Sequence, residues 1–311
     1  MNVRLALVGA VQSTERALQT LARMANLPLL VLTLPPEKSA RHSDYVDLHP
    51  LAGTLGVPVI DVTDVNNPEV RERLSGLELD VIMVIGWSRI CGPEFVAIPR
   101  LGTLGFHPTL LPSMRGRAAL AWTILLGLRE TGATFFWIDE GVDSGPIAAQ
   151  RRIPLTGSEA LRELMDRQLD ALEWMLSDLL KQFSRGERPA LQQDESRATF
   201  LALRRAEDGE IDWSQPAPAI ERLIRAVSKP YPGAFTHLGR RKLTIWSARV
   251  ASYPEWFALL GQVFVVDRDG PVVRCGDGNA LVLLEFDLEE LVGGAKPPSA
   301  FAGQPRLGRD R

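Results

Sequence analysis

The sequence predicts an α/β protein with two domains: a Rossmann-like N-terminal domain on a parallel sheet, and a small C-terminal β-barrel of OB-like type. In the first half, short and almost continuously apolar runs alternate with amphipathic stretches, which is typical of parallel strands buried on both faces. Towards the C-terminus, short β-rich runs follow one another between turn residues, which is typical of a small barrel.

The elements of the first domain follow from these runs in order. Strands are expected over residues 3–9, 27–34, 57–62, 79–86, 102–107 and 133–139. Helices are expected from a cap at Ser13 or Thr14 to residue 26, and over residues 45–55, 117–129 and 155–183. The last helix carries leucine and methionine side chains at helical spacing, so it should bury one face.

Domain boundaries are expected where the composition changes. We assign residues 1–190 to the first domain, 191–208 to a polar linker containing the run QQDES, 209–292 to the barrel and 293–311 to a flexible tail rich in Gly, Pro and charge. In the barrel, a helix is expected over residues 217–227, and strands over 234–236, 242–248, 262–266, 272–275 and 281–286.

The composition argues against several classes of function. A net charge of −3 argues against a broad nucleic-acid surface, so nucleic acid is not an expected partner. The two cysteines, Cys91 and Cys275, stand far apart with no zinc spacing, and no metal site is expected. No apolar run has membrane length, so we expect a soluble cytoplasmic protein with no membrane partner. Neither a GxGxxG motif nor a P-loop is present, which argues against a classical dinucleotide or ATP site.

Chemistry is most plausible around the stretch GFHPTLLPSMRGR, residues 105–117. His107 ends an expected strand, and Asp143 lies in the run DEGVDSG after another. Because ligand sites of parallel sheets lie beyond the carboxyl ends of strands, we expect the two loops to meet in one crevice. An imidazole beside a carboxylate suits proton transfer, and Gly141 and Gly145 would let the backbone approach a flat ligand.

From the pattern alone, other readings stay open. His107 could be a packed residue at a strand end, and Asp139, Glu140 and Asp143 could form a solvated turn. Two arginines, Arg115 and Arg117, could be plain surface charge. The spacing of residues by itself therefore predicts a crevice and no particular reaction.

Longer motifs narrow the choice. HPTLLP is followed by RGRAALAWTILLG and ETGATFFWIDEGVDSG, and later by IDWSQPAPAIERLIRAVSKPYPGAF and KLTIWSARV. In this order and separation they resemble the folate-dependent formyltransferase family, which includes methionyl-tRNA formyltransferases and amino-sugar N-formyltransferases. The resemblance covers residues 1 to about 290. The pieces are short, but their joint order is specific at the level of the family.

The resemblance implies an enzyme that moves a formyl group from 10-formyltetrahydrofolate to an amine. The family uses an Asn, a His and an Asp, of which the His is His107 and the Asp is Asp143 here. The Asn position is Gly105, which has no side-chain donor. The oxyanion could be held by His107, a backbone N–H or a water, or the acceptor could supply a donor. The third alternative is a folate-binding relative without catalysis, and we expect retained activity.

The same resemblance implies where the folate would bind. The pteridine is expected under the strand-end loops, against the segments IGWSRI and WIDEGVD. The expected contacts are Ile85, Gly86, Trp87, Ile90, Asp139, Gly141 and Val142. Trp87 could equally be a packing residue.

The expected acceptor is a small amine, and a nucleotide-linked amino sugar is favoured. In the stretch PPEKSARHSDYVDLHP, the basic residues Lys38 and Arg41 are offset by acidic neighbours, whereas a tRNA acceptor calls for a basic groove. The run RAVSKPYPGAF also reads closer to the sugar-modifying relatives. Expected acceptor contacts are Thr109, Arg115 and Arg117, the arginines for phosphate. Methionyl-tRNA or a small amino-acid or hydroxylamine intermediate are the alternatives, and a homodimer is a possible assembly.

Overall fold

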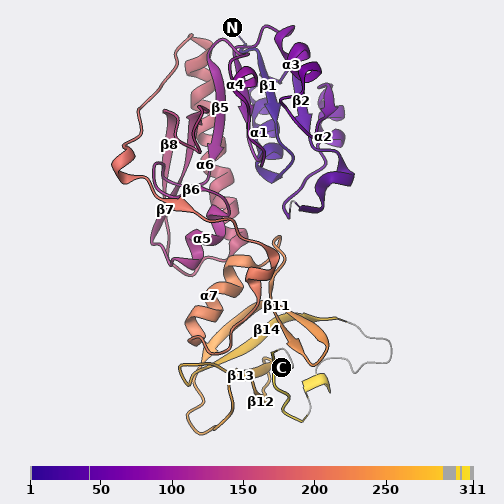
Figure 1. The fold of residues 1–311 in the computed structure, drawn as a ribbon, viewed down its shortest axis with the longest axis vertical. Helices are drawn as coiled ribbons and strands as arrows, with labels where there is room; N and C mark the ends of the chain where they lie inside the picture. Colours follow the sequence, from indigo (N-terminus) through magenta and orange to yellow (C-terminus); the bar gives the residue numbers. More distant parts are fainter. Residues whose placement is uncertain (1, 42, 290–298, 302, 309–311) are drawn as a thin grey trace. The chain divides into compact units, whose positions relative to one another are not determined.

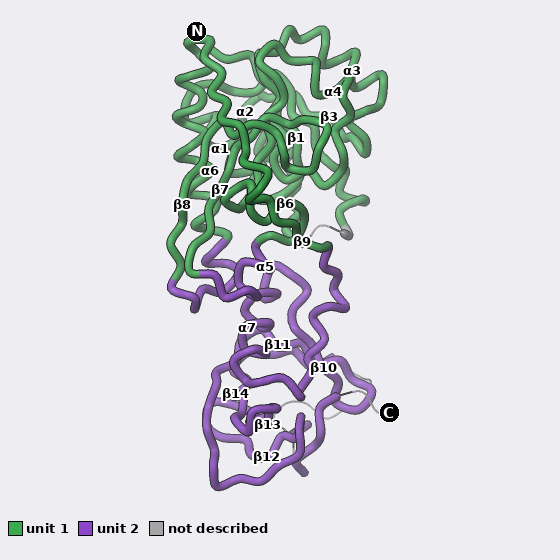
Figure 2. The backbone as a smooth tube through the Cα atoms, turned by 60° about the vertical axis from the view of Figure 1, so that its left-hand side comes forward, with its two compact units in different colours: residues 1–119, 129–155, 165–202 green, residues 120–128, 156–164, 203–311 purple. Residues whose placement is uncertain are grey.

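The computed structural model describes residues 2–41, 43–289, 299–301 and 303–308, which fall into two compact units (Figures 1 and 2). The first unit contains residues 1–119, 129–155 and 165–202, and the second contains residues 120–128, 156–164 and 203–311 (Figure 2). The division is therefore not linear along the chain, whereas our expected boundaries at 190 and 208 were. Those boundaries stay a prediction.

The first unit is built on a seven-stranded sheet in the order β3-β2-β1-β4-β5-β7-β8 (Figure 1). Its strands are β1 (Leu5–Val8), β2 (Leu30–Thr33), β3 (Val59–Asp61), β4 (Val81–Val84), β5 (Gly102–His107), β7 (Glu130–Trp137) and β8 (Ile147–Pro154). The five strands β1 to β5 are parallel to their neighbours, as the buried apolar runs predicted. The pairs β5–β7 and β7–β8 are antiparallel, and β8 has no counterpart among the expected strands.

Helices cover both faces of this sheet. On one face, α1 (Gln12–Arg23), α2 (His49–Leu55) and α6 (Leu161–Ser184) contribute buried side chains such as Leu18 and Leu172. On the other, α3 (Pro68–Ser75) and α4 (Pro93–Val96) contribute Leu74 and Phe95. Each such side chain stabilises the fold by about 1.5–3 kcal/mol through burial.

The helix expected over residues 45–55 begins only at His49. Tyr45 forms a bridge with Val11, and the N–H of Val46 donates to the carbonyl of Ala10. This segment is extended because its backbone pairs with the loop after β1, and Pro50 then occupies the first turn of α2.

The direction of β7 changes how the loop at residues 138–146 reaches the site. Trp137 pairs with Leu104, and the N–H of Ile138 donates to the carbonyl of Thr103. The loop therefore leaves the sheet near the start of β5 and not beside its carboxyl end, which differs from the expectation of two parallel strand ends. To reach His107, which pairs with Thr134, the loop has to turn back along the sheet.

The second unit contains a five-stranded antiparallel sheet in the order β10-β11-β14-β13-β12. Its elements are α7 (Ala217–Val227), β10 (Ala234–Leu238), β11 (Arg241–Ala251), β12 (Val263–Val266), β13 (Pro271–Arg274) and β14 (Ala280–Leu288), together with most of α5 (Ala119–Leu125) (Figure 1). Every strand expected in this part of the sequence is present.

The C-terminal segment joins the two edges of this sheet. Leu307 forms a bridge with Leu238 of β10, and the N–H of Leu307 donates to Gly261, just before β12, at 2.7 Å. The N–H of Val263 in β12 donates to Pro305 at 2.9 Å. These described residues lie in the stretch that we expected to be a flexible tail, and they connect β10 to β12 in the manner of a barrel. Residues 293–298, 302 and 309–311 of that stretch lie outside the described residues.

The stretch expected to be a linker also makes contacts. Leu191 forms a bridge with Ile147, and β9 (Phe200–Leu201) pairs with β6 (Arg115–Gly116) in the first unit. Short 3₁₀ turns complete the chain at Pro36–Arg41, Glu195–Arg197, Ala206–Gly209 and Ser299–Phe301. Among the described helices, none is both long and apolar enough to cross a membrane.

Glu159, a buried residue just before α6, gives a test of local stability. Burial would raise its pKa, but hydrogen bonds from the N–H groups of Thr156 and Gly157 and from the Thr156 hydroxyl lower it to about 2, from an ordinary 4.5. We expect Glu159→Gln to lower the free energy of unfolding at neutral pH by about 1–2 kcal/mol. Because the carboxylate is favoured in the folded state, the wild-type advantage is full above pH 4.5 and is lost as the pH falls through about 2.

Chemical denaturation over this pH range checks the prediction. Glu72→Gln, at an exposed position of α3, is the matched control and should unfold like the wild type at each pH. An equal loss in both variants would contradict the role given to Glu159.

Candidate functional site

His107, at the end of β5, is held by one of its ring nitrogens. Its side chain is buried, and Nε2 lies 2.7 Å from the carbonyl oxygen of Met114. A carbonyl oxygen can only accept, so Nε2 carries a hydrogen and donates it. The other nitrogen, Nδ1, lies 3.6 Å from Oδ2 of Asp143. Nδ1 is therefore the nitrogen that can exchange a proton with a reactant.

Asp143 is held in a strained backbone conformation beside this imidazole. Its φ is +50°, in the left-handed region that few non-glycine residues adopt. Its Oδ2 accepts a hydrogen bond from the N–H of Gly116 at 2.8 Å. The same carboxylate oxygen thus faces both a backbone donor and His107, which suits a group that binds or orients a proton on the ring.

Three side chains form hydrogen bonds to the backbone of the loop that follows His107. Gln168 of α6 donates to the carbonyls of Pro108 at 3.2 Å and Gly132 at 2.9 Å. The Thr134 hydroxyl donates to the carbonyl of Thr109 at 2.7 Å. Gln150 of β8 donates to Leu111 and to Thr134 Oγ1, both at 2.9 Å. Fixation of the loop therefore comes from these amides and this hydroxyl as well as from its two prolines.

Gly105 lies opposite Phe136 across the β5–β7 pair. A Cβ atom at Gly105 would stand 2.8 Å from Cζ of Phe136 and 3.2 Å from Cγ1 of Ile138. Phe136 is itself buried in a cluster with Leu111 and Ile147. An aromatic ring therefore fills the space in which a side chain at position 105 would begin.

Of the three expected acceptor contacts, only Arg117 is exposed. Its Nη2 donates to the carbonyl of Ser88, in the loop after β4, at 2.7 Å. Thr109 is 1% exposed, and its hydroxyl donates to the carbonyl of Ser113.

Arg115 is 2% exposed, and its guanidinium makes two hydrogen bonds to Glu195 and two to Oε1 of Gln193. The hydrogen bonds with Glu195 raise the pKa of Arg115 and lower that of Glu195. In this structure Arg115 is therefore buried and binds Gln193 and Glu195. Its N–H groups, which we expected to bind a phosphate, donate to these two side chains instead.

The residues expected to contact folate fall into two groups. Ile85 and Gly86 directly follow the central strand β4: Ile85 is fully buried, and a Cβ at Gly86 would stand 2.0 Å from Val11 Cγ2. Trp87 is half-buried against the face that contains Phe95, and its Nε1 has no hydrogen-bond partner among the described residues. A small hollow lined by Ala10, Leu34, Gly86, Trp87, Ser88 and Arg89 lies at the carboxyl ends of β1, β2 and β4.

The second group lies at the surface. Ile90 and Val142 are 86% and 63% exposed, so both apolar side chains are accessible to a ligand. Asp139 Oδ1 accepts from the N–H of Gly141 at 3.1 Å and from the Ser144 hydroxyl at 2.7 Å, so it shapes its own loop. Exposed apolar side chains and a hollow at the strand ends are compatible with the binding of a flat heterocycle.

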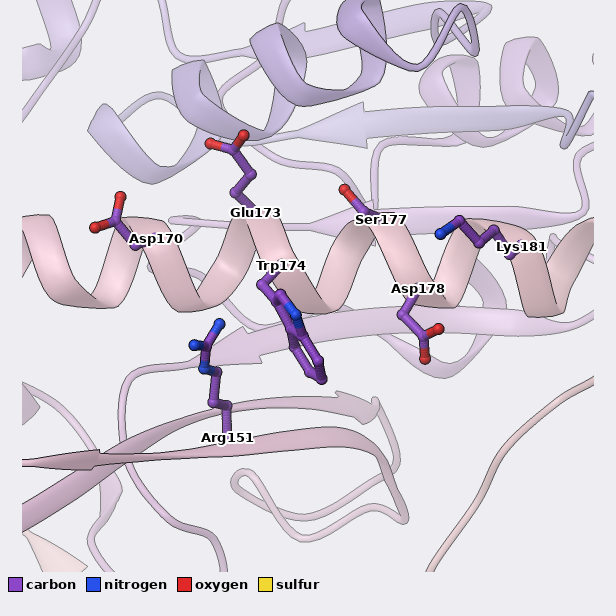
Figure 3. Close-up of a pocket in the computed structure, with 7 residues that line it drawn as sticks. All are labelled: Arg151, Asp170, Glu173, Trp174, Ser177, Asp178 and Lys181. Atoms are coloured by element: carbon purple, nitrogen blue, oxygen red, sulfur yellow. The ribbon is translucent and has the colours of Figure 1, made fainter.

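A separate groove of about 530 Å³ runs along α6 and contains neither His107 nor Asp143 (Figure 3). Arg151 of β8 reaches towards the helix, and its guanidinium lies 4.8 Å from the ring of Trp174 (Figure 3). Two of its acidic residues, Asp170 and Glu173, form ion pairs with Arg16. The groove is therefore separate from the site residues that the sequence predicted.

Among the described residues, no cluster of three or more His, Cys, Asp or Glu side chains could hold a metal ion.

The sequence did not point to Gln193, Glu195, Gln150 or Gln168. Their partners lie from 16 to 80 residues away in the chain. Gln193 and Glu195 belong to the run QQDES, whose polar composition predicted a solvated linker. No local pattern distinguishes such residues, since only the fold brings their partners to them.

Two family models match the chain. One described as formyl transferase matches residues 18–180, and one described as formyl transferase, C-terminal domain, matches residues 204–291. The methionyl-tRNA formyltransferase of Citrifermentans bemidjiense is 32% identical over 290 residues, which is 93% of this chain and 90% of that protein.

Solved structures share the fold. HypX from Aquifex aeolicus, in complex with tetrahydrofolic acid, matches with a TM-score of 0.68 at 16% identity, over 100% of this chain and 49% of HypX. The chain thus spans about half the length of HypX. An N-formyltransferase from Helicobacter canadensis, in complex with folinic acid and dTDP-3-aminofucose, matches with a TM-score of 0.65 at 16% identity, over 91% of this chain and 99% of that one.

Gly105→Asn tests whether the position has room for an amide. We expect the variant to lose about 1–3 kcal/mol of unfolding free energy, because the new side chain overpacks the buried ring of Phe136. Thermal or chemical unfolding measures this loss. Gly105→Asn combined with Phe136→Leu should recover part of it, and a single variant as stable as the wild type would show that the ring moves freely aside.

Proposed function

Because the chain belongs to the formyl transferase family, we propose that it transfers a formyl group from 10-formyltetrahydrofolate to the primary amine of a small molecule. The observation that carries the proposal is the pairing of His107 and Asp143. Nε2 of the imidazole is committed to the Met114 carbonyl, and Nδ1 faces the carboxylate at 3.6 Å. One exchangeable proton position beside a fixed carboxylate suits the proton transfers that formyl transfer requires.

In the reaction, a bond forms between the amine nitrogen and the formyl carbon, and the bond from that carbon to the folate nitrogen breaks. The amine loses one proton and the departing folate nitrogen gains one, so the proton count balances. His107 takes up and releases this proton at Nδ1, and Asp143 stabilises the imidazole while it is charged. The Gly116 N–H keeps the Asp143 carboxylate in place during the exchange.

The folate supplies the activated formyl group when it is bound. Exposed Ile90 and Val142 offer apolar contact to a flat ring, and Trp87 lines the hollow at the carboxyl ends of β1, β2 and β4. Folate ligands in the HypX and Helicobacter canadensis structures are compatible with this choice of donor. No amide donor stands at position 105, so protonated His107 is our candidate for stabilising the developing oxyanion.

For the acceptor we propose a nucleotide-linked amino sugar. The net charge of −3 and the balanced charges around Lys38 do not provide a basic groove for RNA. Arg117 is exposed beside the loop after β4 and is the proposed phosphate contact. Methionyl-tRNA is the second candidate, because the relative from Citrifermentans bemidjiense bears that name and is 32% identical.

His107→Ala and Asp143→Asn should each lower turnover by about 10²–10⁴-fold, because each removes one part of the proton-transfer pair. Initial rates of folate-dependent formylation measure this, with circular dichroism as the check on folding. Glu140→Gln, at an exposed position in the same loop, is the control and should keep most of the activity. Near wild-type rates in both site variants would rule out the assignment.

A comparison of acceptors decides the substrate class. We expect formylation of one or more nucleotide-linked amino sugars, and negligible formylation of methionyl-tRNA at physiological salt, because the net charge is −3 and Lys38 and Arg41 are offset by acidic neighbours. Arg117→Ala should raise the KM for the sugar acceptor, since it removes the proposed phosphate contact. Efficient formylation of methionyl-tRNA by the wild type would replace our choice of acceptor with the second candidate.

A further inference from the structure

The stretch at residues 191–201 lies against both loops of the candidate site. On one side, Leu191 pairs with Ile147, directly after the Asp143 loop. On the other, the Thr199 hydroxyl accepts from the N–H of Met114 at 2.8 Å, and the Thr199 carbonyl accepts from the N–H of Arg115 at 2.9 Å. A segment that the sequence predicted to be a linker thus contacts the loop that contains Asp143 and the loop that follows His107.

Within this segment, Gln193 binds both sides of the Asp143 turn. Its Nε2 donates to the carbonyl of Asp143 at 2.9 Å and to the carbonyl of Gly145 at 2.7 Å. Its Oε1 accepts from Nη2 of Arg115 at 2.8 Å. The same Oε1 also accepts from Nε of Arg115 at 3.2 Å, so both N–H groups and both lone pairs of this amide have partners here.

Together with a hydrogen bond from Gly116, these contacts form a ring of hydrogen bonds through Asp143, Gln193, Arg115 and Gly116. The residue after Arg115 is Gly116, whose N–H donates to Oδ2 of Asp143. The dipeptide Arg115–Gly116 therefore holds Asp143 twice, directly at its carboxylate and through Gln193 at its carbonyl. Since φ of Asp143 is +50°, outside contacts have to stabilise this conformation.

Glu195 neutralises the positive charge of the buried Arg115 side chain. Its Oε1 and Oε2 accept from Arg115 at 2.6 and 2.8 Å, while the Arg115 side chain is 3% exposed. A guanidinium at this depth needs a paired carboxylate, and its five donors then keep a fixed plane. The Arg115 guanidinium that binds Gln193 is therefore held in place by Glu195.

We propose that Gln193 and Arg115 are positioning residues, which set the Asp143 carboxylate against Nδ1 of His107. The inference rests on the proposed function, since it assigns these residues a part in the same formyl transfer. Neither side chain touches the reacting atoms. Their effect is on the rate of the proton-transfer step and not on the binding of donor or acceptor.

Gln193→Ala and Gln193→Glu test the proposal with Arg115 left in place. The glutamate keeps the size of the side chain and a partner for Arg115, but it has no N–H to donate to the two carbonyls. We expect kcat to fall by about 10–100-fold in both variants, with the KM values for folate and acceptor within about threefold of the wild type. Gln182→Glu on α6, where the wild-type amide donates to Asp178, is the matched control and should behave like the wild type.

A second measurement does not depend on activity. The chain has four histidines, so ¹⁵N-histidine labelling gives a spectrum in which His107 is assigned by its loss in His107→Ala. We expect the ring ¹⁵N shifts of His107 to change in both Gln193 variants and to stay at wild-type values in Gln182→Glu. A change at Nδ1 together with the fall in kcat supports the proposal.

The remaining outcomes separate the two claims. Unchanged His107 shifts in the Gln193 variants overturn the positioning role, whether or not the wild type transfers formyl groups. A rise in KM with unchanged kcat also overturns it, because the residue would then serve binding. A wild-type protein that transfers no formyl group to any acceptor overturns the proposed function, and the His107 spectra still decide the inference.

Discussion

The carboxylate of Asp143 stands 3.6 Å from the imidazole of His107, although β5, which ends at His107, and β7, which precedes the Asp143 loop, run in opposite directions. Because the loop after β7 leaves the sheet beside Thr103, it must turn back along the sheet to meet the end of β5. The left-handed conformation of Asp143 is part of that return. Polar contacts to the Asp143 loop and to the loop after His107 hold the two segments that meet here.

Those contacts act in two layers. Gln168, Thr134 and Gln150 fix the carbonyls of the loop that follows His107, and Gln193 fixes the carbonyls beside Asp143. A buried carbonyl with no hydrogen-bond partner destabilises the folded state, because it has lost its bonds to water. These side chains therefore stabilise the loops as well as fix their conformation. Arg115, which binds Gln193, is neutralised by Glu195 from the segment at residues 191–201. The charge of Arg115 is thus used in contacts within the protein, whereas Arg117 is exposed.

Gly105 shows how packing and chemistry constrain one another at this site. The ring of Phe136 occupies the space beside it, so a side chain can be added at position 105 only if a buried aromatic moves. The lack of a side chain at position 105 therefore matches the packing of β5 against β7. In the second unit, a comparable dependence links the C-terminal segment to β10 and β12, because the backbone of Leu307 and Pro305 pairs with both edges of the sheet.

The sequence by itself determined the fold class, the parallel strands β1 to β5, the barrel strands and the identity of His107 and Asp143 as candidates. These features leave local signals: apolar runs at strand spacing, turn residues between them, and motifs of adjacent residues. The tertiary structure alone decided the antiparallel direction of β7 and β8, the closing role of residues 305–308, and the internal use of Arg115. It also brought Gln193 to the Asp143 loop and Glu195 to Arg115. Their partners lie 48 to 80 residues away in the chain, so no local pattern of polarity could separate them from a solvated linker.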